Sequence, residues 1–429
     1  MAIFQLSSTN PDFSYIIAKN PGSGMSIKTI RKGNAFAWYS TEDTYNVYFK
    51  DADNEISYKE QAEEMFEYLN TTRYCSTLFP LNAINSFFSS TLKKLHEKDL
   101  GEYKHGVLIN AIHVKNVSYL NYFQRHLNEF DLSFEELASR TYQLRIQTTS
   151  KTIHELLHYT TVLCVFLSIV SDEYIDFTDD VIRKYITSMQ VIDAPYYIRY
   201  LFARNVLNSR KKFLAFKNEL EKTNHYEIDF KFGNTAKQRQ DWISEQLKFE
   251  DAILDIGCGE GAYAIPYSKK INEHDYFAID IDPEIRERLK YKINNKEIEN
   301  IAIYESLSHF LEFYDYDLNV DVLLTEVIEH MSVKDATKLV KSVLSKVNFD
   351  NFIITTPNAE FNGLYQLDGF RHDDHKWEMT KEEFVKWIDS ILSNSKYSYT
   401  FSSVGDCVDG VSLSQAVVIK QQKVKEHQK

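Results

Sequence analysis

The chain has 429 residues, 43% of them hydrophobic and 14% aromatic, so it is long and apolar enough to form two domains with full cores. Its formal net charge of -13 argues against a protein that coats RNA or DNA regardless of sequence, but is compatible with a local patch that captures one strand end. The four cysteines are scattered without paired spacing, which is typical of reduced thiols in a cytoplasmic protein.

The first 235 residues mix strand and helix patterns. They open on MAIFQLSSTN, which lacks the basic and apolar regions of a signal peptide. The runs FAWYS, YNVYFK and GVLINAIHV predict strands, and NAINSFFSSTLKKLHE predicts a helix. The longest apolar stretch, Thr160 to Val170, is too short to span a bilayer, so no membrane partner is expected. We predict an α+β amino-terminal module over residues 1–235, whose basic helical end, Asp180 to about Lys222, is typical of a solvated helix face.

This module contains a pattern that is found in zinc proteases, His154-Glu155-Leu-Leu-His158. On a helix, such a pattern supplies two zinc ligands and a general base. The position of a third histidine ligand holds Cys164 instead, and the other candidate, Glu173, lies in the acidic run SDEYIDFTDD. We therefore expect a helix with incidental histidines and keep a protease as the distant alternative.

From Asp251 onward, strand and helix patterns alternate. The predicted strands are AILDI, YFAIDID, IAIYE, VDVLLTE and FIITTP. A helix with proline at its first position, PEIRERLKYKINN, follows the second strand, and NTAKQRQDWISEQLKFED predicts a helix before the first. This alternation predicts a doubly wound α/β domain of Rossmann-like type, with a parallel sheet, over residues 236–425.

A glycine-rich turn follows the first of these strands, and its spacing points to a particular cofactor. Gly257, Gly259 and Gly261 let the backbone approach a ligand closely, at the start of a helix with free N–H groups. Asp280 ends the second strand, where a ribose-binding acid is expected. Together with Asp255 this pattern resembles the S-adenosylmethionine (SAM) fingerprint of class I methyltransferases. That resemblance assigns Asp255, Gly257 and Gly259 to the amino-acid end of SAM and Asp280 to its ribose hydroxyls. A purely structural turn and an NAD-type site are the alternatives.

The stretch TEVIEHM places Glu326, Glu329 and His330 directly after the fourth strand, beside the expected cofactor crevice. In a helix these residues would share one face. Two carboxylates and an imidazole are costly to bury together, and a divalent cation such as Mn²⁺ or Mg²⁺ removes that cost. A second cluster, FRHDDHKWEMT, contains His372 and His375 and could supply a fourth ligand.

Four motifs in order, DIGCGEG, EVIEH, TPNAEFN and DHKWE, resemble those of the HEN family, which are metal-dependent 2′-O-methyltransferases of RNA 3′ ends. His372 has no ligand counterpart in that family, Trp377 stands where Phe is commoner, and Met379 replaces an aromatic residue. The resemblance implies four metal ligands: Glu326, Glu329, His330 and His375.

The amino-terminal region also resembles, more loosely, that of the bacterial members, through FSYIIAKNP, YCSTLFPLNAINSFF and HYTTVLCVFLSIVSDEY. In that branch the region belongs to RNA repair and is linked to activation of the ligase of a polynucleotide kinase-phosphatase. The resemblance therefore implies two partners, an RNA 3′ end and a kinase-phosphatase/ligase.

The function that the resemblance implies is metal-dependent methyl transfer from SAM to the 2′-hydroxyl of the 3′-terminal nucleotide of RNA. The metal fits this chemistry, because a bound ion activates and orients a weakly nucleophilic hydroxyl. Two alternatives stay open. One is a metal-independent SAM methyltransferase of a small molecule or protein, and the other is a protein that acts mainly as a ligase-activating adaptor. The identity of the metal and of the general base, for which His330 and His375 are candidates, is also open.

Overall fold

The computed structural model describes residues 2–30, 33–51, 75–171, 173, 175–271, 274–365, 370–393 and 396–421. The chain divides into two compact units, Met1–His225 and Tyr226–Lys429. The sequence predicted a boundary between residues 235 and 236, and residues 422–425 of the predicted second domain lie outside the described residues. The division falls earlier because β8 (Ile228–Asp229) pairs with β14 (Tyr397–Val408) at the edge of the second unit's sheet.

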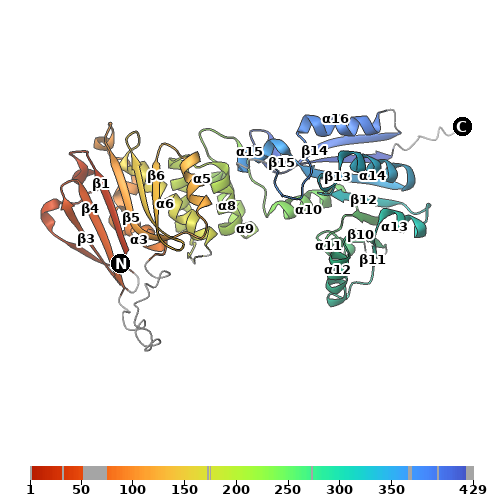
Figure 1. Ribbon diagram of the computed structural model, residues 1–429, viewed down its shortest axis with the longest axis horizontal. Helices are drawn as coiled ribbons and strands as arrows, with labels where there is room; N and C mark the ends of the chain where they lie inside the picture. The colour runs from red at the N-terminus through yellow and green to blue at the C-terminus, as the bar shows by residue number, and fades with distance from the viewer. Residues whose placement is uncertain are drawn as a thin grey trace. The chain divides into compact units, whose positions relative to one another are not determined.

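The first unit contains a seven-stranded sheet in which every neighbouring pair is antiparallel (Figure 1). In spatial order its strands are β2 (Ser26–Ile30), β3 (Gly33–Thr41), β4 (Thr44–Asp51), β1 (Ala2–Ser8), β5 (His105–His113), β7 (Thr141–Thr148) and β6 (Asp131–Ala138). The α-helices are α1 (Phe13–Ile16), α3 (Leu78–Phe87), α4 (Ser89–Lys93), α5 (Ser118–His126), α6 (Ile153–Val170), α7 (Asp179–Val191), α8 (Tyr196–Val206) and α9 (Arg210–Leu220). The predicted α+β module is confirmed.

Helix α6 is the central helix of this unit. By length and composition it could cross a membrane, whereas the sequence had indicated only a shorter apolar stretch, but 78% of it is buried inside the structure. It contacts α3, α4, α7 and α8 as well as strands β5 and β7. A capping box between Thr152 and Glu155 fixes its first turn. The apolar composition is therefore that of a core helix.

The His-Glu-x-x-His pattern lies at the start of α6 and is used structurally. Nδ1 of His154 donates to the carbonyl oxygen of Thr91 (2.6 Å), and Nε2 of His158 donates to that of Leu92 (3.1 Å). The hydroxyl of Ser188 lies 2.9 Å from Nδ1 of His158. Burial lowers the pKa of His158 to about 4, so the ring is neutral near pH 7. The two histidines fasten α6 to α4 and α7, which accounts for the pattern without zinc.

The second unit contains an eight-stranded sheet (Figure 1). In spatial order its strands are β11 (Ile301–Tyr304), β10 (Tyr276–Ile279), β9 (Ala252–Ile256), β12 (Val320–Thr325), β13 (Phe349–Pro357), β15 (Val411–Gln421), β14 and β8. The α-helices are α10 (Thr235–Gln246), α11 (Ala264–Ser268), α12 (Pro283–Asn295), α13 (Leu307–Phe313), α14 (Val333–Lys346), α15 (Asn362–Tyr365) and α16 (Lys381–Leu392). Strands β9 to β13 run parallel, which confirms the Rossmann-like prediction.

Both faces of the central strands β9 and β12 are buried, which explains why these strands are almost entirely apolar. Leu254 and Val322 face one cluster, which is completed by side chains of α13, α14 and α16. Their neighbours Ile253 and Leu323 face a second cluster, which is completed by α10, α11 and α12. Because β9, β10 and β12 are parallel neighbours, the segments that follow them all begin at the same end of the sheet, where the carboxyl ends of these strands lie.

The predicted parallel sheet is extended by an antiparallel hairpin that the sequence analysis did not predict, formed by β14 and β15 next to β13. The two strands are joined by Asp409 (φ 49°) and Gly410 (φ 80°). An Asp-Gly pair with two positive φ angles is the usual chemistry of a tight hairpin turn, so the sequence did carry this signal.

Candidate active site

The glycine turn after β9 is shaped by close contacts on two of its three glycines. All three have positive φ angles. A Cβ atom at Gly257 would lie 2.3 Å from Val327, and one at Gly261 would lie 2.5 Å from Leu289. At Gly259 a Cβ atom would meet nothing within 4 Å, so the turn is open to a ligand there.

Asp280 lies directly beside this turn at the end of β10. One of its carboxylate oxygens accepts a hydrogen bond from the backbone N–H of Gly259 (3.0 Å), and the other accepts from that of Asp282 (3.0 Å). The structure thus brings the predicted cofactor-binding turn and the predicted ribose-binding acid into contact. Their contacts with SAM stay a prediction.

Asp255, the remaining predicted SAM residue, is fully buried in β9. Its Oδ2 accepts a hydrogen bond from the hydroxyl of Tyr276 (2.8 Å), while Oδ1 has no partner among the described residues. Burial raises the pKa of Asp255 to about 7. Asp255 therefore links β9 to β10 just before the glycine turn, and its Oδ1 remains available to accept a hydrogen bond from a further donor.

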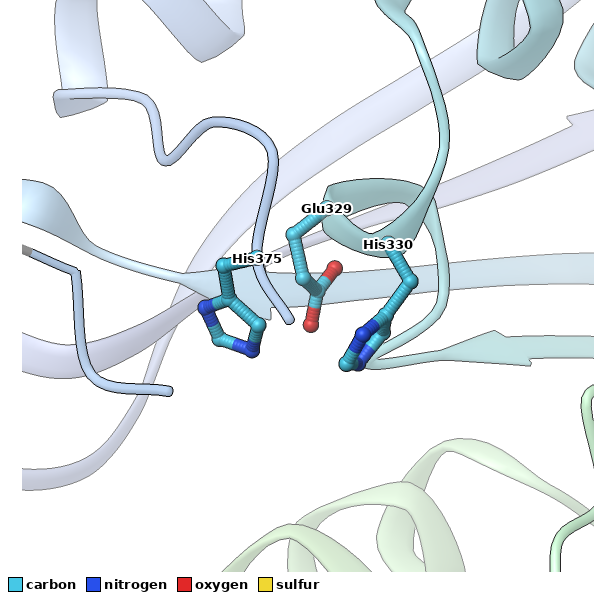
Figure 2. A group of neighbouring side chains, drawn as sticks. All are labelled: Glu329, His330 and His375. Carbon is cyan, nitrogen blue, oxygen red and sulfur yellow. The ribbon is translucent and has the colours of Figure 1, made fainter. Parts of the chain in front are cut away.

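Three of the four predicted metal ligands converge at the end of the next strand. Glu329, His330 and His375 each offer one ligand atom, and these atoms lie within 4.8 Å of one another (Figure 2). Glu329 and His330 belong to the 3₁₀ helix η4 (Ile328–His330), whereas His375 comes from the loop before α16.

Hydrogen bonds join these two segments without an ion. The backbone N–H of Lys376 donates to the carbonyl oxygen of Glu329 (2.8 Å). The indole N–H of Trp377 donates to the carbonyl oxygen of Met331 (2.7 Å). These hydrogen bonds therefore hold Glu329, His330 and His375 close together before any ion binds.

The environment of Glu329 fits a cation. Its side chain is buried, Oε2 accepts a hydrogen bond from the hydroxyl of Thr356 (3.1 Å), and Oε1 has no hydrogen-bond partner among the described residues. Burial raises the pKa of Glu329 well above its ordinary value, and the nearby charge of Glu326 adds to this effect. A buried carboxylate with an orphan oxygen beside two imidazoles is stabilised by a divalent ion, and this mixed N/O donor set suits Mn²⁺ or a similar metal.

Glu326 lies outside this group of three. It has a left-handed backbone (φ 54°) and precedes η4, so the expected helical face shared with Glu329 and His330 does not form. Its Oε2 pairs with Nη1 of Arg239 (3.2 Å), and its Oε1 accepts a hydrogen bond from the hydroxyl of Thr355 (3.0 Å). The role of Glu326 as a fourth ligand stays a prediction.

A cavity of about 500 Å³ opens over these groups. Besides Glu326 and the cluster of three, its walls include Arg239, Tyr365, Arg371, His372 and Asp374. The His372 ring lies 5.1 Å from the His375 ring but is not a member of the ligand group. The cavity thus combines a candidate metal site with two guanidinium groups.

Three side chains that organise this site were not predicted from the sequence: Arg239, Arg371 and Glu378. Arg239 stands in α10, far from every motif, and nothing in its surroundings signals a functional residue. Arg371 and Glu378 flank His375 within the second cluster. Burial alone would raise the pKa of Glu378, but hydrogen bonds from Asn362, from the backbone of Arg371 and from His375 hold it below its ordinary value.

Comparison with known proteins identifies the family. A family model described as the Hen1 N-terminal domain matches residues 3–225, which is slightly more than half of the 429 residues. This chain belongs to the Hen1 family. A second family model, described as a methyltransferase domain, matches residues 253–348. The order of the two matches agrees with the resemblance found in the sequence motifs.

Curated relatives and a solved structure extend this result. The chain is 29% identical over 198 residues to the small RNA 2′-O-methyltransferase of Arabidopsis thaliana, a match that covers 40% of this chain and 20% of that protein. It is 34% identical over 191 residues to the Rattus norvegicus enzyme of the same name, covering 39% and 45%. The chain thus spans less than half of either relative. The structure of the Pnkp1/Rnl/Hen1 RNA repair complex contains a chain that is 28% identical, with a TM-score of 0.81 over 98% of this chain and 100% of that chain.

Proposed function

We propose that this chain transfers a methyl group from SAM to the 2′-hydroxyl of the 3′-terminal nucleotide of an RNA, with the help of a divalent metal. The observation that carries the proposal is that the predicted cofactor site and the candidate metal site both lie at the carboxyl ends of neighbouring parallel strands. The glycine turn with Asp280 follows β9 and β10, and the cluster of Glu329, His330 and His375 follows β12. Ligands bind at these strand ends in doubly wound sheets, so the methyl donor and the acceptor meet there.

In this proposal the glycine turn holds the amino-acid end of SAM. Gly259 lets the cofactor approach the backbone, because no neighbouring atom fills the space beside it. The carboxylate of Asp280 accepts hydrogen bonds from the ribose hydroxyls. Holding both reactants in fixed positions lowers the barrier to methyl transfer.

Glu329, His330 and His375 would hold the metal, and we retain Glu326 as the proposed fourth ligand. When bound, a divalent ion supplies Lewis-acid activation to a hydroxyl group, which is a weak nucleophile at neutral pH. The guanidinium groups of Arg239 and Arg371 place positive charge in the same cavity, which favours an anionic RNA end despite the acidic net charge of the protein.

We also propose that the protein works in RNA repair with a polynucleotide kinase-phosphatase and a ligase. The support is the similarity of almost the whole chain to the Hen1 component of the Pnkp1/Rnl/Hen1 RNA repair complex. All four cysteines are free, which supports a reducing location such as the cytoplasm.

The test is methyl transfer from labelled SAM to short RNAs that differ only at the 3′ end. An end with both hydroxyls should be methylated, whereas 2′-deoxy and 3′-phosphate ends should not. A 3′-deoxy end tests whether the second hydroxyl is needed. EDTA should inhibit transfer and Mn²⁺ should restore it. Full activity in chelator would favour the metal-independent alternative, and the absence of transfer to any RNA would overturn the proposal.

A further inference from the structure

His375 has two ring nitrogens with different surroundings. Nδ1 lies 2.6 Å from Oε1 of Glu378, and both side chains are almost completely buried, with 3% and 0% exposed. Figure 2 shows the other ring nitrogen turned toward Glu329 and His330. His330 is held differently, because its Nδ1 faces the exposed carboxylate of Asp374 at 3.1 Å.

The network around Glu378 determines the direction of its hydrogen bond to His375. The guanidinium of Arg371 can only donate, so the atom of Asn362 that accepts from its Nε (2.8 Å) is the amide oxygen. The amide nitrogen of Asn362 therefore donates to Oε2 of Glu378 (2.5 Å). Oε1 of Glu378 accepts from the backbone N–H of Arg371 (2.8 Å).

Asn362 and the backbone of Arg371 both donate to Glu378, an arrangement that suits the ionised carboxylate, whose two oxygens can only accept. Nδ1 of His375 must therefore be the donor in the contact with Oε1. A neutral imidazole that carries its proton on Nδ1 has its lone pair on Nε2, which is the nitrogen that faces the cluster.

We propose that Glu378 is a positioning residue, which keeps the proton of His375 on Nδ1 and so presents the lone pair of Nε2 to the cation. This inference rests on the metal site of the proposed function and goes beyond it by assigning a role to a residue outside the candidate ligand group. Carboxylates behind ligating histidines fix the tautomer and the ring orientation, and their loss costs ~10–100-fold in metal affinity.

The first experiment measures Mn²⁺ affinity of the full chain by electron paramagnetic resonance. Glu378→Gln keeps the size of the side chain but replaces one acceptor by a donor, so it should weaken Mn²⁺ binding ~10–100-fold while SAM affinity, measured by calorimetry, stays unchanged. The matched control is Glu382→Gln, which removes an exposed carboxylate that pairs with Lys386 on α16 and should leave both affinities unchanged.

The outcomes separate this inference from the proposed function. If the unchanged protein does not bind Mn²⁺, both fail. If it binds Mn²⁺ and Glu378→Gln binds equally well, only the role of Glu378 is overturned.

A second measurement needs no variant of Glu378, so it decides the question even if Glu378→Gln does not fold. In the metal-free protein labelled with ¹⁵N-histidine, the His375 signal, identified by its loss in His375→Gln, should report a proton on Nδ1. A proton on Nε2 near neutral pH would overturn the inference.

Discussion

The carboxylate of Glu326 and the guanidinium of Arg239 form an ion pair of 3.2 Å, in which only 20% and 15% of the two side chains are exposed. The positive charge of Arg239 reduces the repulsion between two neighbouring carboxylates, because it attracts both Glu326 and Glu329, which repel each other. Without a bound cation, this arginine, together with the nearby charge of Arg371, reduces the electrostatic cost of placing two carboxylates side by side at the end of β12.

Replacement of Arg239 by alanine should therefore destabilise the metal-free protein. Breaking a largely buried ion pair leaves an uncompensated charge, so we expect a loss of about 2–4 kcal/mol in the free energy of unfolding, measured in EDTA. Added Mn²⁺ should recover more stability in this variant than in the unchanged protein. Lys237→Ala removes an exposed charge from the same helix and should change stability by less than about 0.5 kcal/mol. Equal effects of the two substitutions would contradict the role assigned to Arg239.

Asp280→Ala should weaken SAM binding at least about ten-fold, because it removes the proposed acceptor for the ribose hydroxyls and a hydrogen bond to Gly259 that shapes the turn. Calorimetry measures the affinity, and circular dichroism checks that the fold survives. Glu284→Gln, on the exposed side of α12, is the control and should bind SAM normally. Unchanged SAM affinity in Asp280→Ala would contradict the assignment of Asp280 to the ribose of SAM.

Substitution of a cluster ligand by alanine should separate metal binding from cofactor binding. Glu329→Ala should abolish or sharply reduce methyl transfer while SAM affinity stays nearly intact. Its melting temperature in EDTA should be equal to or higher than that of the unchanged protein, because the substitution removes a buried carboxylate oxygen without a partner. Mn²⁺ at 100 times its dissociation constant should stabilise the unchanged protein by about 2.7 kcal/mol and the variant by much less. Metal stabilisation of equal size in both proteins would exclude Glu329 as a ligand.

Acid should destabilise the first unit through its buried histidines. Burial lowers the pKa of His158 and of His105 from 6.5 to about 4. Because the folded-state pKa lies below the unfolded one, the stability is fully present above about pH 6.5 and is lost as the pH falls toward 4, by on the order of 3 kcal/mol for each histidine. Urea unfolding between pH 7 and 4 measures this loss, and His158→Gln should flatten the profile. A pH profile that is the same with and without His158 would contradict the prediction.

The sequence was most informative where one residue type has a single structural use. The glycines of the turn and the apolar runs of β9 and β12 indicated the sheet and the end at which it binds ligands. Positive φ angles favour glycine, and strands buried on both faces consist mainly of apolar residues, so both features can be recognised in the sequence. The proposed ligands Glu329 and His330 are neighbours in the chain, so their convergence could also be predicted.

The remaining features depend on contacts between distant segments. Arg239 meets Glu326 across 87 positions, and no local pattern marks either residue as a partner of the other. The left-handed backbone of Glu326 interrupts the helix that its spacing suggested. The Asp409-Gly410 turn is a different case, because its signal was present and the β14–β15 hairpin could have been predicted.

The start of the second unit yields the last prediction, since the residues before α10 belong to its sheet. Besides the pairing of β8 with β14, the backbone N–H of Glu227 donates to Asp409 (2.7 Å) and that of Lys231 donates to Asp406 (2.7 Å). A shortened chain that begins at Tyr226 keeps these contacts, whereas one that begins at Asn234 loses them.

Both shortened chains should fold and bind SAM, because the glycine turn, Asp280 and the proposed metal ligands all lie beyond residue 234. The longer chain should retain methyl transfer. The chain that begins at Asn234 should be less stable by on the order of 2–4 kcal/mol, since each lost hydrogen bond contributes about 1 kcal/mol. Thermal unfolding followed by circular dichroism compares the two, with SAM affinity as the check on the fold. Equal stability would show that β8 contributes nothing to the unit, and loss of SAM binding by both chains would show that this unit depends on the first 225 residues.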